Sequence, residues 1–307
     1  MPHLERASFS GHETFPFRYT WLKKAVDHVG SDATVFGRED AMVTLGVGKN
    51  MVQSMRHWAL LTGVIEEDPD IVNNRGRSLR VTKLGDHLLG KDGWDPYLED
   101  PATLWLLHWQ IANAPEEATT WYWVFNQLPR TEFTRQDLVA ELLRLSEQHG
   151  WSRIAETSLK RDVDTFVRTY ATPKAGKKGL VEDTIDCPLA DLGLLGIGAD
   201  GETITIRRGD HATLPTEVVV YALIEFLRLR GHTAKTLSLE DALFAPGSPG
   251  RVFALNEVGL LRRLEGVHAF TKGKLAYDET AGLKQFLVYE LPDPISVVRA
   301  YYRRTKA

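Results

Sequence analysis

A stretch near the N-terminus, LGVGKNMVQSMRHW over Leu45–Trp58, places two glycines directly before a helix with two distinct faces. Apolar residues recur at helical spacing on one face and polar residues recur on the other. The inward face holds Val52, Met55 and Ala59. The solvent face is predicted to hold Lys49, Gln53 and Arg56, with Asn50, Ser54 and His57 beside them. Glycines and a lysine before such a helix favour either a phosphate-binding loop or a helix-turn-helix that contacts DNA.

Spacing excludes the phosphate-binding loop. That motif requires a glycine five positions before the glycine that precedes lysine, and Ser or Thr after the lysine. Here Val43 occupies the first position and Asn50 follows Lys49. The preceding residues EDAMVTL also have a helical pattern, where the motif needs a buried strand. We therefore expect no nucleotide cofactor, and we interpret the glycines as the tight turn between two helices.

The residues around this turn follow the order of a winged helix-turn-helix. A helix over Gly37–Leu45 precedes the turn and the helix Lys49–Leu61 follows it. Two β-like segments come next, Gly63–Glu67 and Ser78–Thr82, joined by a flexible basic connection. These elements predict a winged-helix DNA-binding domain over residues 1–93. A winged helix that contacts proteins instead of DNA remains the alternative.

This domain supplies most of the candidate DNA contacts, because Arg, Lys, Gln and Asn side chains hydrogen-bond phosphates and base edges. The candidates are Lys49, Asn50, Gln53, Arg56 and His57 from the second helix, and Arg75, Arg77 and Arg80 from the strands and their connection. The chain of 307 residues carries a formal net charge of −4, so a DNA-binding surface must be local.

The middle region, residues 94–179, is predicted to be helical and rich in buried aromatics. Its last part, PKAGKKG, is a basic connector that adds Lys174, Lys177 and Lys178 to the candidate DNA contacts. These cations give the protein a second place where it can hold phosphate.

The last third, residues 180–307, is predicted to form an α+β domain. A strongly apolar helix over Thr216–Leu229 is followed by two shorter helices and by strands over Ala269–Leu275 and Gln285–Leu291. This order resembles a second winged helix. The whole chain is therefore predicted to be mainly α, with small β wings.

A second unusual stretch, FSGHETFPFRYTWLKKA over Phe9–Ala25, gathers polar groups in a turn between aromatic residues. His12, Glu13 and Arg18 are side chains that can serve as a general base, a metal ligand and a phosphate clamp. A structural loop whose polar groups bond internally is the alternative. The sequence contains no His-Glu-x-x-His, paired-cysteine or Gly-x-Ser-x-Gly motif that would place hydrolysis elsewhere.

Composition limits where the protein works. One cysteine excludes a disulfide framework and fits a reducing compartment. The sequence has no apolar run of about 18 residues, and its first residues lack an apolar signal core. We therefore expect a cytoplasmic protein that does not contact a membrane.

Several of these segments together resemble a bacterial family long known only as a domain of unknown function. They are FSGHETFPFRYTWLKKA, LGVGKNMVQSMRHWALLTGVI, RVTKLGDHLL, DPYLEDPATLWLLHWQI and PGRVFALNEVGLLRRLE. The family includes the SspB-type DNA nickases of phosphorothioation defence systems, whose genes lie beside those of an ATPase and a reductase-like protein. The resemblance extends over nearly the full chain.

The resemblance implies a protein that binds double-stranded DNA and nicks one strand, so that sulfur can replace a phosphate oxygen. It also implies the ATPase and the reductase-like sulfur-transfer component as partners. Combined with the motif above, it places His12 as base, Glu13 as metal ligand or orienting group, and Arg18 on the scissile phosphate. A divalent cation, Mg²⁺ or Mn²⁺, is expected to assist the hydrolysis. A non-enzymatic DNA-binding adaptor that recruits the modification enzymes is the alternative.

Overall fold

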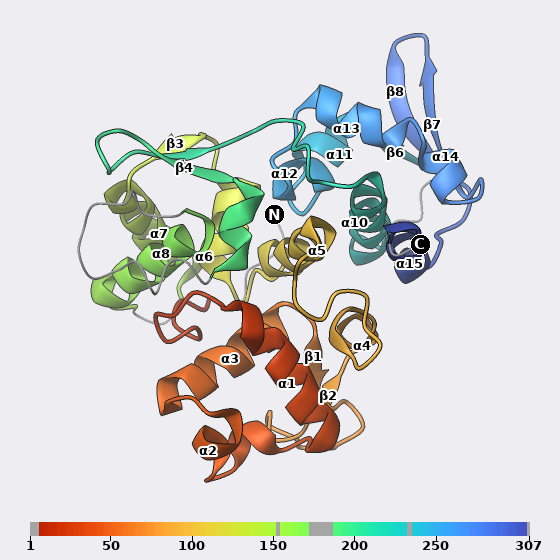
Figure 1. Cartoon of the computed structure of the whole chain (residues 1–307). Coiled ribbons are helices and arrows are strands. Elements are labelled where there is room, and N and C mark those ends of the chain that lie inside the picture. The colour runs from red at the N-terminus through yellow and green to blue at the C-terminus, as the bar shows by residue number, and fades with distance from the viewer. Residues whose placement is uncertain (1–5, 152–153, 172–186, 232–234, 306–307) are drawn as a thin grey trace. The chain divides into compact units, whose positions relative to one another are not determined.

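The computed structural model describes residues 6–151, 154–171, 187–231 and 235–305. The chain, shown in Figure 1, folds into two compact units. The first comprises Met1–Trp123 and Pro129–Ile206, and the second comprises Val124–Leu128 and Arg207–Ala307. The domain boundary predicted at residue 179 lies outside the described residues, and the boundary predicted at residue 93 stays a prediction.

The N-terminal part of the first unit contains the elements expected around the glycine turn. They are α1 (Tyr19–Ser31), a 3-10 turn (Val35–Gly37), α2 (Ala41–Leu45), α3 (Lys49–Leu61), β1 (Ile65–Glu67), β2 (Leu79–Val81) and α4 (Lys83–Leu89). Helix α3 has the bounds that its periodicity predicts. Gly46 ends α2 with φ at 63°, a left-handed conformation that glycine adopts without a steric penalty.

Strands β1 and β2 form an antiparallel pair in which Ile65 lies opposite Val81. Thr82 then caps α4, because its hydroxyl accepts a hydrogen bond from the Gly85 N–H at 2.9 Å. Such a cap stabilises a helix start by about 1 kcal/mol. The helix predicted over Gly37–Leu45 is shorter in the structure, and its first residue belongs to the 3-10 turn.

The rest of the first unit is mainly helical. Its elements are α5 (Pro101–Ala112), α6 (Thr119–Tyr122), β3 (Glu132–Phe133), α7 (Arg135–His149), α8 (Glu156–Tyr170), a 3-10 turn (Pro188–Leu192), β4 (Leu195–Ile197) and β5 (Ile204–Ile206). The three strands form an antiparallel sheet in the order β3-β5-β4. Trp58, Trp105 and Trp121 are almost fully buried, so these tryptophans belong to the core.

The second unit contains α10 (Thr216–Leu229), β6 (Thr236–Ser238), α11 (Leu239–Phe244), α12 (Pro249–Val252), α13 (Glu257–Leu264), α14 (Val267–Phe270), β7 (Leu275–Thr280), β8 (Leu283–Val288) and α15 (Pro294–Thr305). Its antiparallel sheet has the order β6-β8-β7. The strand predicted over Ala269–Leu275 is wrong, because that segment begins in a helical turn and bends at Gly273, where φ is 80°.

Five residues from the middle of the chain belong to this second unit. Within Val124–Leu128, the side-chain oxygen of Asn126 accepts from the Gly247 N–H at 2.7 Å. The Asn126 carbonyl accepts from the Arg251 guanidinium at 2.6 and 2.9 Å. The segment is therefore fixed by hydrogen bonds to residues more than 100 positions later in the sequence.

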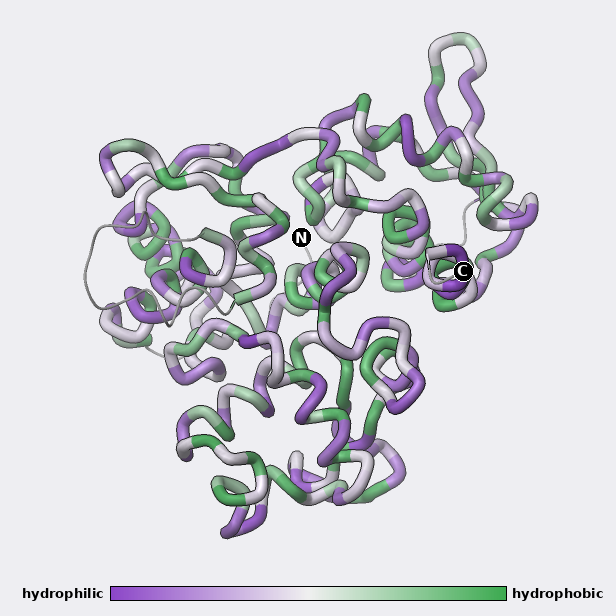
Figure 2. The backbone as a smooth tube through the Cα atoms, in the orientation of Figure 1, coloured by the Kyte–Doolittle hydropathy of each residue, from purple (hydrophilic) through white to green (hydrophobic). Residues whose placement is uncertain are grey.

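The described chain is mainly helical with small antiparallel sheets, which confirms the predicted α+β class. Hydrophobic and hydrophilic residues follow one another along helices such as α1 and α3 in Figure 2, as expected for helices that pack one face on a core. Among the helices of the described ranges, none is long and apolar enough to cross a membrane.

Candidate functional site

The exposed face of α3 begins directly after the glycine turn. Lys49, Asn50 and Gln53 are exposed, and they follow Gly48, the residue that caps the helix in an extended conformation. The apolar face is as predicted, since Val52, Met55 and Ala59 are at most 3% exposed. Ser54 was predicted on the solvent face but is fully buried, because it lies one helical turn before the buried Trp58.

Arg56 ties α3 to the connection between β1 and β2. Its Nη2 donates to the Gly76 carbonyl at 3.0 Å and lies 3.7 Å from Oε1 of Glu67. Gly76 has φ at 72°, and a Cβ there would lie 2.6 Å from the Arg56 guanidinium. This close approach places the connection beside the middle of α3.

The three arginines predicted in and after this connection divide into two kinds. Arg80 donates to Glu66 at 2.7 Å and to Asp70 at 3.2 Å, and the hydrogen bond to Glu66 is the main cause of its raised pKa. Arg75 and Arg77 are exposed and form no ion pair with any residue that the structure describes. These two cations remain available for a phosphate.

His57 follows the exposed Gln53 by one helical turn and lies against the turn that contains His12. Its ring meets Gly11 so closely that a Cβ at that glycine would lie 2.3 Å from Nδ1. Burial, together with the neighbouring His12 and Arg56, lowers the pKa of His57 to about 3. The side chain is therefore neutral at physiological pH, and its predicted contact with DNA stays a prediction.

His12 is 2% exposed and both of its ring nitrogens have partners. Nδ1 lies 3.1 Å from the Thr14 N–H and must accept from it, so the proton of the neutral ring is on Nε2. Nε2 lies 2.8 Å from Oδ1 of Asp162. The other oxygen of Asp162 accepts from the Thr120 hydroxyl at 2.5 Å. In this arrangement His12 has no free lone pair with which to take a proton.

Asp162 and Thr120 are the two residues of this buried cluster that the sequence analysis missed. Asp162 lies between Leu159, Val163 and Phe166 on the buried side of α8, and it is 1% exposed. A carboxylate within the apolar stripe of an amphipathic helix is unusual unless it is paired. That signal predicts a buried partner, although it does not say which one.

In the sequence, Glu13 and Arg18 flank the aromatic residues Phe15 and Phe17. Glu13 is exposed and, like Thr14, has a positive φ, of 48° and 67° respectively. Arg18 precedes α1 and places its guanidinium 5.6 Å from the centre of the Trp21 ring. The proposal that His12, Glu13 and Arg18 form one catalytic site stays a prediction.

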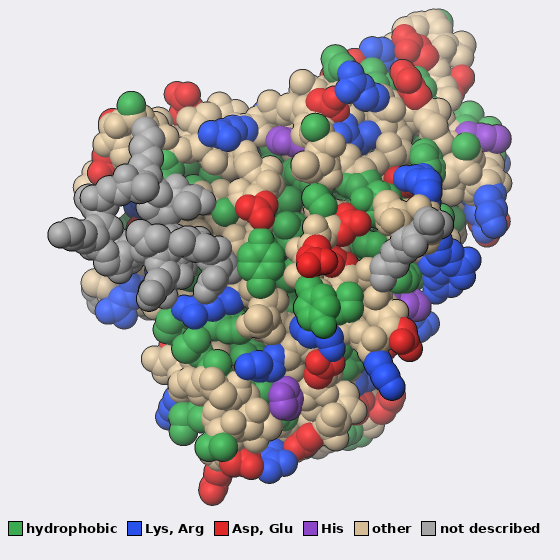
Figure 3. Space-filling model, viewed as in Figure 1, with side chains coloured by type: hydrophobic (Ala, Val, Ile, Leu, Met, Phe, Trp, Pro, Cys, Tyr) green, Lys and Arg blue, Asp and Glu red, His purple; other side chains and the backbone are tan. Residues whose placement is uncertain are grey.

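Within the described residues, no group of three or more His, Cys, Asp or Glu side chains is arranged to hold a metal ion. Lys174, Lys177 and Lys178 lie outside the described residues, so the structure does not place them. Figure 3 shows Lys and Arg side chains interspersed with Asp and Glu on one face of the molecule, in keeping with the small net charge.

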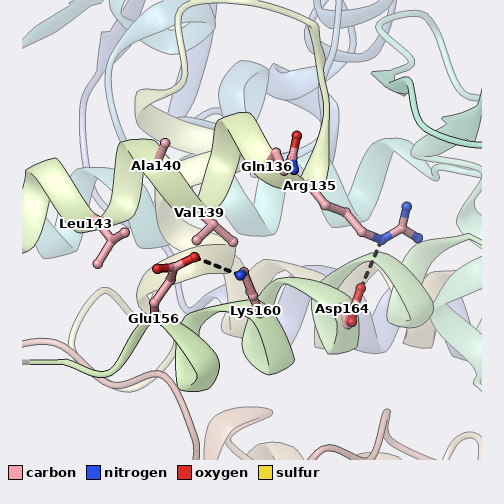
Figure 4. A pocket seen from close by; sticks show the side chains of 8 residues that line it. All are labelled: Arg135, Gln136, Val139, Ala140, Leu143, Glu156, Lys160 and Asp164. Atoms are coloured by element: carbon pink, nitrogen blue, oxygen red, sulfur yellow. Dashed lines mark ion pairs between the residues drawn. The ribbon is translucent and has the colours of Figure 1, made fainter.

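A hollow of about 380 Å³ lies between α7 and α8 (Figure 4). Its floor contains Val139, and its charged groups pair with one another. Lys160 bonds Glu156 at 2.7 Å, and Arg135 bonds Asp164 at 3.0 Å. Because these charges are already neutralised, the hollow is not a strong anion or cation site.

A family model described as a protein of unknown function, DUF4007, matches residues 9–302. A magnesium ion-bound SspB crystal structure is similar over 100% of this chain and 91% of its own, with 31% identity and a TM-score of 0.86. A second SspB crystal structure is similar over 99% and 91% of the two chains, with 30% identity and a TM-score of 0.85. No curated protein sequence matches the chain.

Proposed function

Because this chain belongs to the DUF4007 family, we propose that it is an SspB-type DNA nickase of a phosphorothioation system. The observation that carries this proposal is the full-length similarity to SspB, with a TM-score of 0.86 at 31% identity. In this role the protein binds double-stranded DNA and opens one strand by hydrolysis. Its proposed partners are the ATPase and the reductase-like sulfur-transfer component of the same system.

We assign duplex binding to a winged helix formed by α1 to α4. Lys49, Asn50 and Gln53 offer the side chains that read base edges in the major groove. Arg56 supports this assignment because it fixes the strand connection, with its unpaired Arg75, beside α3. One continuous surface can then meet a groove and the adjacent phosphates.

The second unit also has the element order of a winged helix, with α13 in the position of the reading helix. The cations of α13 and β8 are already engaged. Arg262 and the buried Arg263 both bond Asp210, and Lys284 of β8 bonds Glu257 at 2.7 Å. A surface whose cations are neutralised attracts phosphate weakly, so DNA binding is proposed for the first unit.

Glu13 is the carboxylate that we propose holds the divalent cation. Magnesium sites commonly use one or two carboxylates together with water and substrate phosphates, so an exposed carboxylate in a rigid turn is compatible with one. Such a cation stabilises developing negative charge and activates water. His12 and Asp162 act through position, since they hold the turn that presents Glu13.

The test is relaxation of supercoiled plasmid by the purified protein with Mg²⁺ or Mn²⁺. We expect a nicked product, and we expect Glu13→Gln and Arg18→Ala to lose most of this activity. Glu39→Gln, another exposed acid of the same unit, is the matched control and should nick normally. Binding of Mn²⁺, followed by electron paramagnetic resonance, should weaken in Glu13→Gln. Normal nicking by Glu13→Gln would remove this residue from the site.

A non-enzymatic DNA-binding adaptor is the second candidate. The engaged ring of His12 favours it, as does the lack of a preassembled metal site among the described residues. An adaptor would retain plasmid in a gel-shift assay and would leave it supercoiled with every divalent cation tested.

A further inference from the structure

The connection between β1 and β2, residues 68–78, carries two adjacent aliphatic side chains in water. Val72 is 87% exposed and Ile71 is 45% exposed. A single exposed aliphatic residue is common on protein surfaces. Here two neighbouring ones form an exposed aliphatic patch at the tip of a connection that lies beside α3.

Internal hydrogen bonds brace this tip. The side chain of Asn74 is almost buried, and its Nδ2 donates to the carbonyls of Ser78 at 2.7 Å and of Asp68 at 3.2 Å. Its Oδ1 accepts from the Ser78 N–H at 2.7 Å. One side chain thus joins both ends of the connection. The tip is prearranged with Ile71 and Val72 outward, and it does not fold them onto the core.

The charges around the tip leave cations available. Asp70 is bound by Arg80, and Asp68 accepts from the backbone N–H of Asp70 at 3.1 Å. Arg75 and Arg77, as described above, have no ionic partner in the described chain. This tip is complementary to DNA in two ways. Its unpaired arginines can contact the phosphates that line a groove, and its aliphatic side chains can contact the apolar faces of the stacked base pairs.

We propose that Ile71 and Val72 form an apolar wedge that enters the minor groove between base pairs and kinks the bound duplex. Proteins that bend DNA insert side chains of this kind between base steps, while their arginines contact the minor groove and the adjacent phosphates. The inference rests on the proposed function, since it requires duplex binding by the first unit. It adds that binding partly unstacks and bends the DNA.

A duplex of about 25 base pairs that contains easily kinked TA and CA steps provides the test. Dyes at both ends report bending by energy transfer, 2-aminopurine beside the TA step reports unstacking, and fluorescence anisotropy reports binding. EDTA in the buffer prevents cleavage. The variant is Ile71→Ser with Val72→Ser. The matched control is Leu283→Ser, which alters a 57% exposed aliphatic residue where β8 begins, in the second unit.

We expect the wild type and Leu283→Ser to raise energy transfer and 2-aminopurine fluorescence. The double serine variant should leave both near their values in free DNA, with affinity reduced by less than about tenfold, because phosphate contacts carry most of it. Both replaced side chains are exposed, so the melting temperature should not change. Two results would overturn the wedge and leave the proposed function standing. One is binding of the wild type without bending, and the other is bending of the duplex by the double serine variant. Lack of any binding at low salt would overturn both.

Discussion

Nε2 of His12 lies 2.8 Å from Oδ1 of Asp162, which joins a turn near the start of the chain to a helix 150 residues later. The pair is buried, and the tautomer is fixed by the Thr14 N–H at Nδ1. The turn that carries Glu13 is therefore held by a hydrogen bond between two buried side chains, those of His12 and Asp162.

Removal of this donor should destabilise the protein. His12→Ala leaves the buried Asp162 with one partner fewer, and we expect a loss of about 2–3 kcal/mol in the free energy of unfolding. Urea denaturation measures it. Glu13→Ala, at the exposed neighbouring position, is the control and should change stability by less than about 0.5 kcal/mol. Equal effects of the two substitutions would contradict a structural role for His12.

The partly buried ring of His57 predicts a dependence of stability on pH. Its pKa is about 3 in the folded protein, against 6.5 for an ordinary histidine. Between these values the unfolded chain binds a proton that the folded protein does not bind. The stability associated with the neutral His57 ring is therefore fully present above pH 6.5. It is lost as the pH falls from 6.5 toward 3, because protonation then favours the unfolded chain.

The measurement compares unfolding free energies at pH 7 and pH 5 for the wild type and His57→Gln. The wild type should lose more stability over this interval than the variant, which lacks the titrating group. His268→Gln, at an exposed position of the second unit, should behave like the wild type. If wild type and His57→Gln show parallel changes, the ring does not resist protonation as inferred.

The exposed cations of the first unit should set the salt dependence of DNA binding. Arg75→Ala with Arg77→Ala should make the slope of log affinity against log salt less steep by about 1–2, since each phosphate contact contributes about 0.9. Lys49→Ala should weaken binding as well. Lys235→Ala removes an exposed cation of the second unit and serves as the control. An unaltered slope in the double variant would move the DNA surface elsewhere.

Arg56 should act on the strand connection that it holds. In Arg56→Ala the bond to the Gly76 carbonyl is lost, so amide hydrogen exchange should accelerate across residues 68–78. Arg56→Lys keeps the charge but loses the planar guanidinium, and it should restore exchange only in part. Mass spectrometry of the peptides resolves these residues. A variant with native exchange in the connection but weaker DNA binding would identify Arg56 as a direct contact instead.

Helices with a clear apolar stripe could be predicted closely from the sequence. Lys49–Leu61 and Thr216–Leu229 have the predicted bounds, because glycines or polar residues mark their ends and periodicity marks their faces. The strand expected over Ala269–Leu275 failed because a short apolar run fits a helical turn as well as a strand. In the structure the helical turn Val267–Phe270 takes the start of this segment, and the strand begins only at Leu275.

The candidate site was less predictable, since its key contacts join residues far apart in sequence. His12, Glu13 and Arg18 stand out by their local pattern, but the pattern does not reveal that Asp162 occupies one nitrogen of His12. Helical periodicity likewise placed His57 in solvent, although the turn at Gly11 covers it. Side-chain partners of this kind follow from how elements pack, which one-dimensional spacing does not encode.

The segment Val124–Leu128, which belongs to the second unit, has a consequence for how the chain matures on the ribosome. Asn126 leaves the ribosome 125 residues before Arg251, its hydrogen-bond partner. At about 5–20 residues per second, this interval lasts roughly 6–25 seconds. During that time Phe125, which is 2% exposed in the finished protein, has no completed core to enter. A chaperone therefore has several seconds in which to bind this apolar segment of the nascent protein.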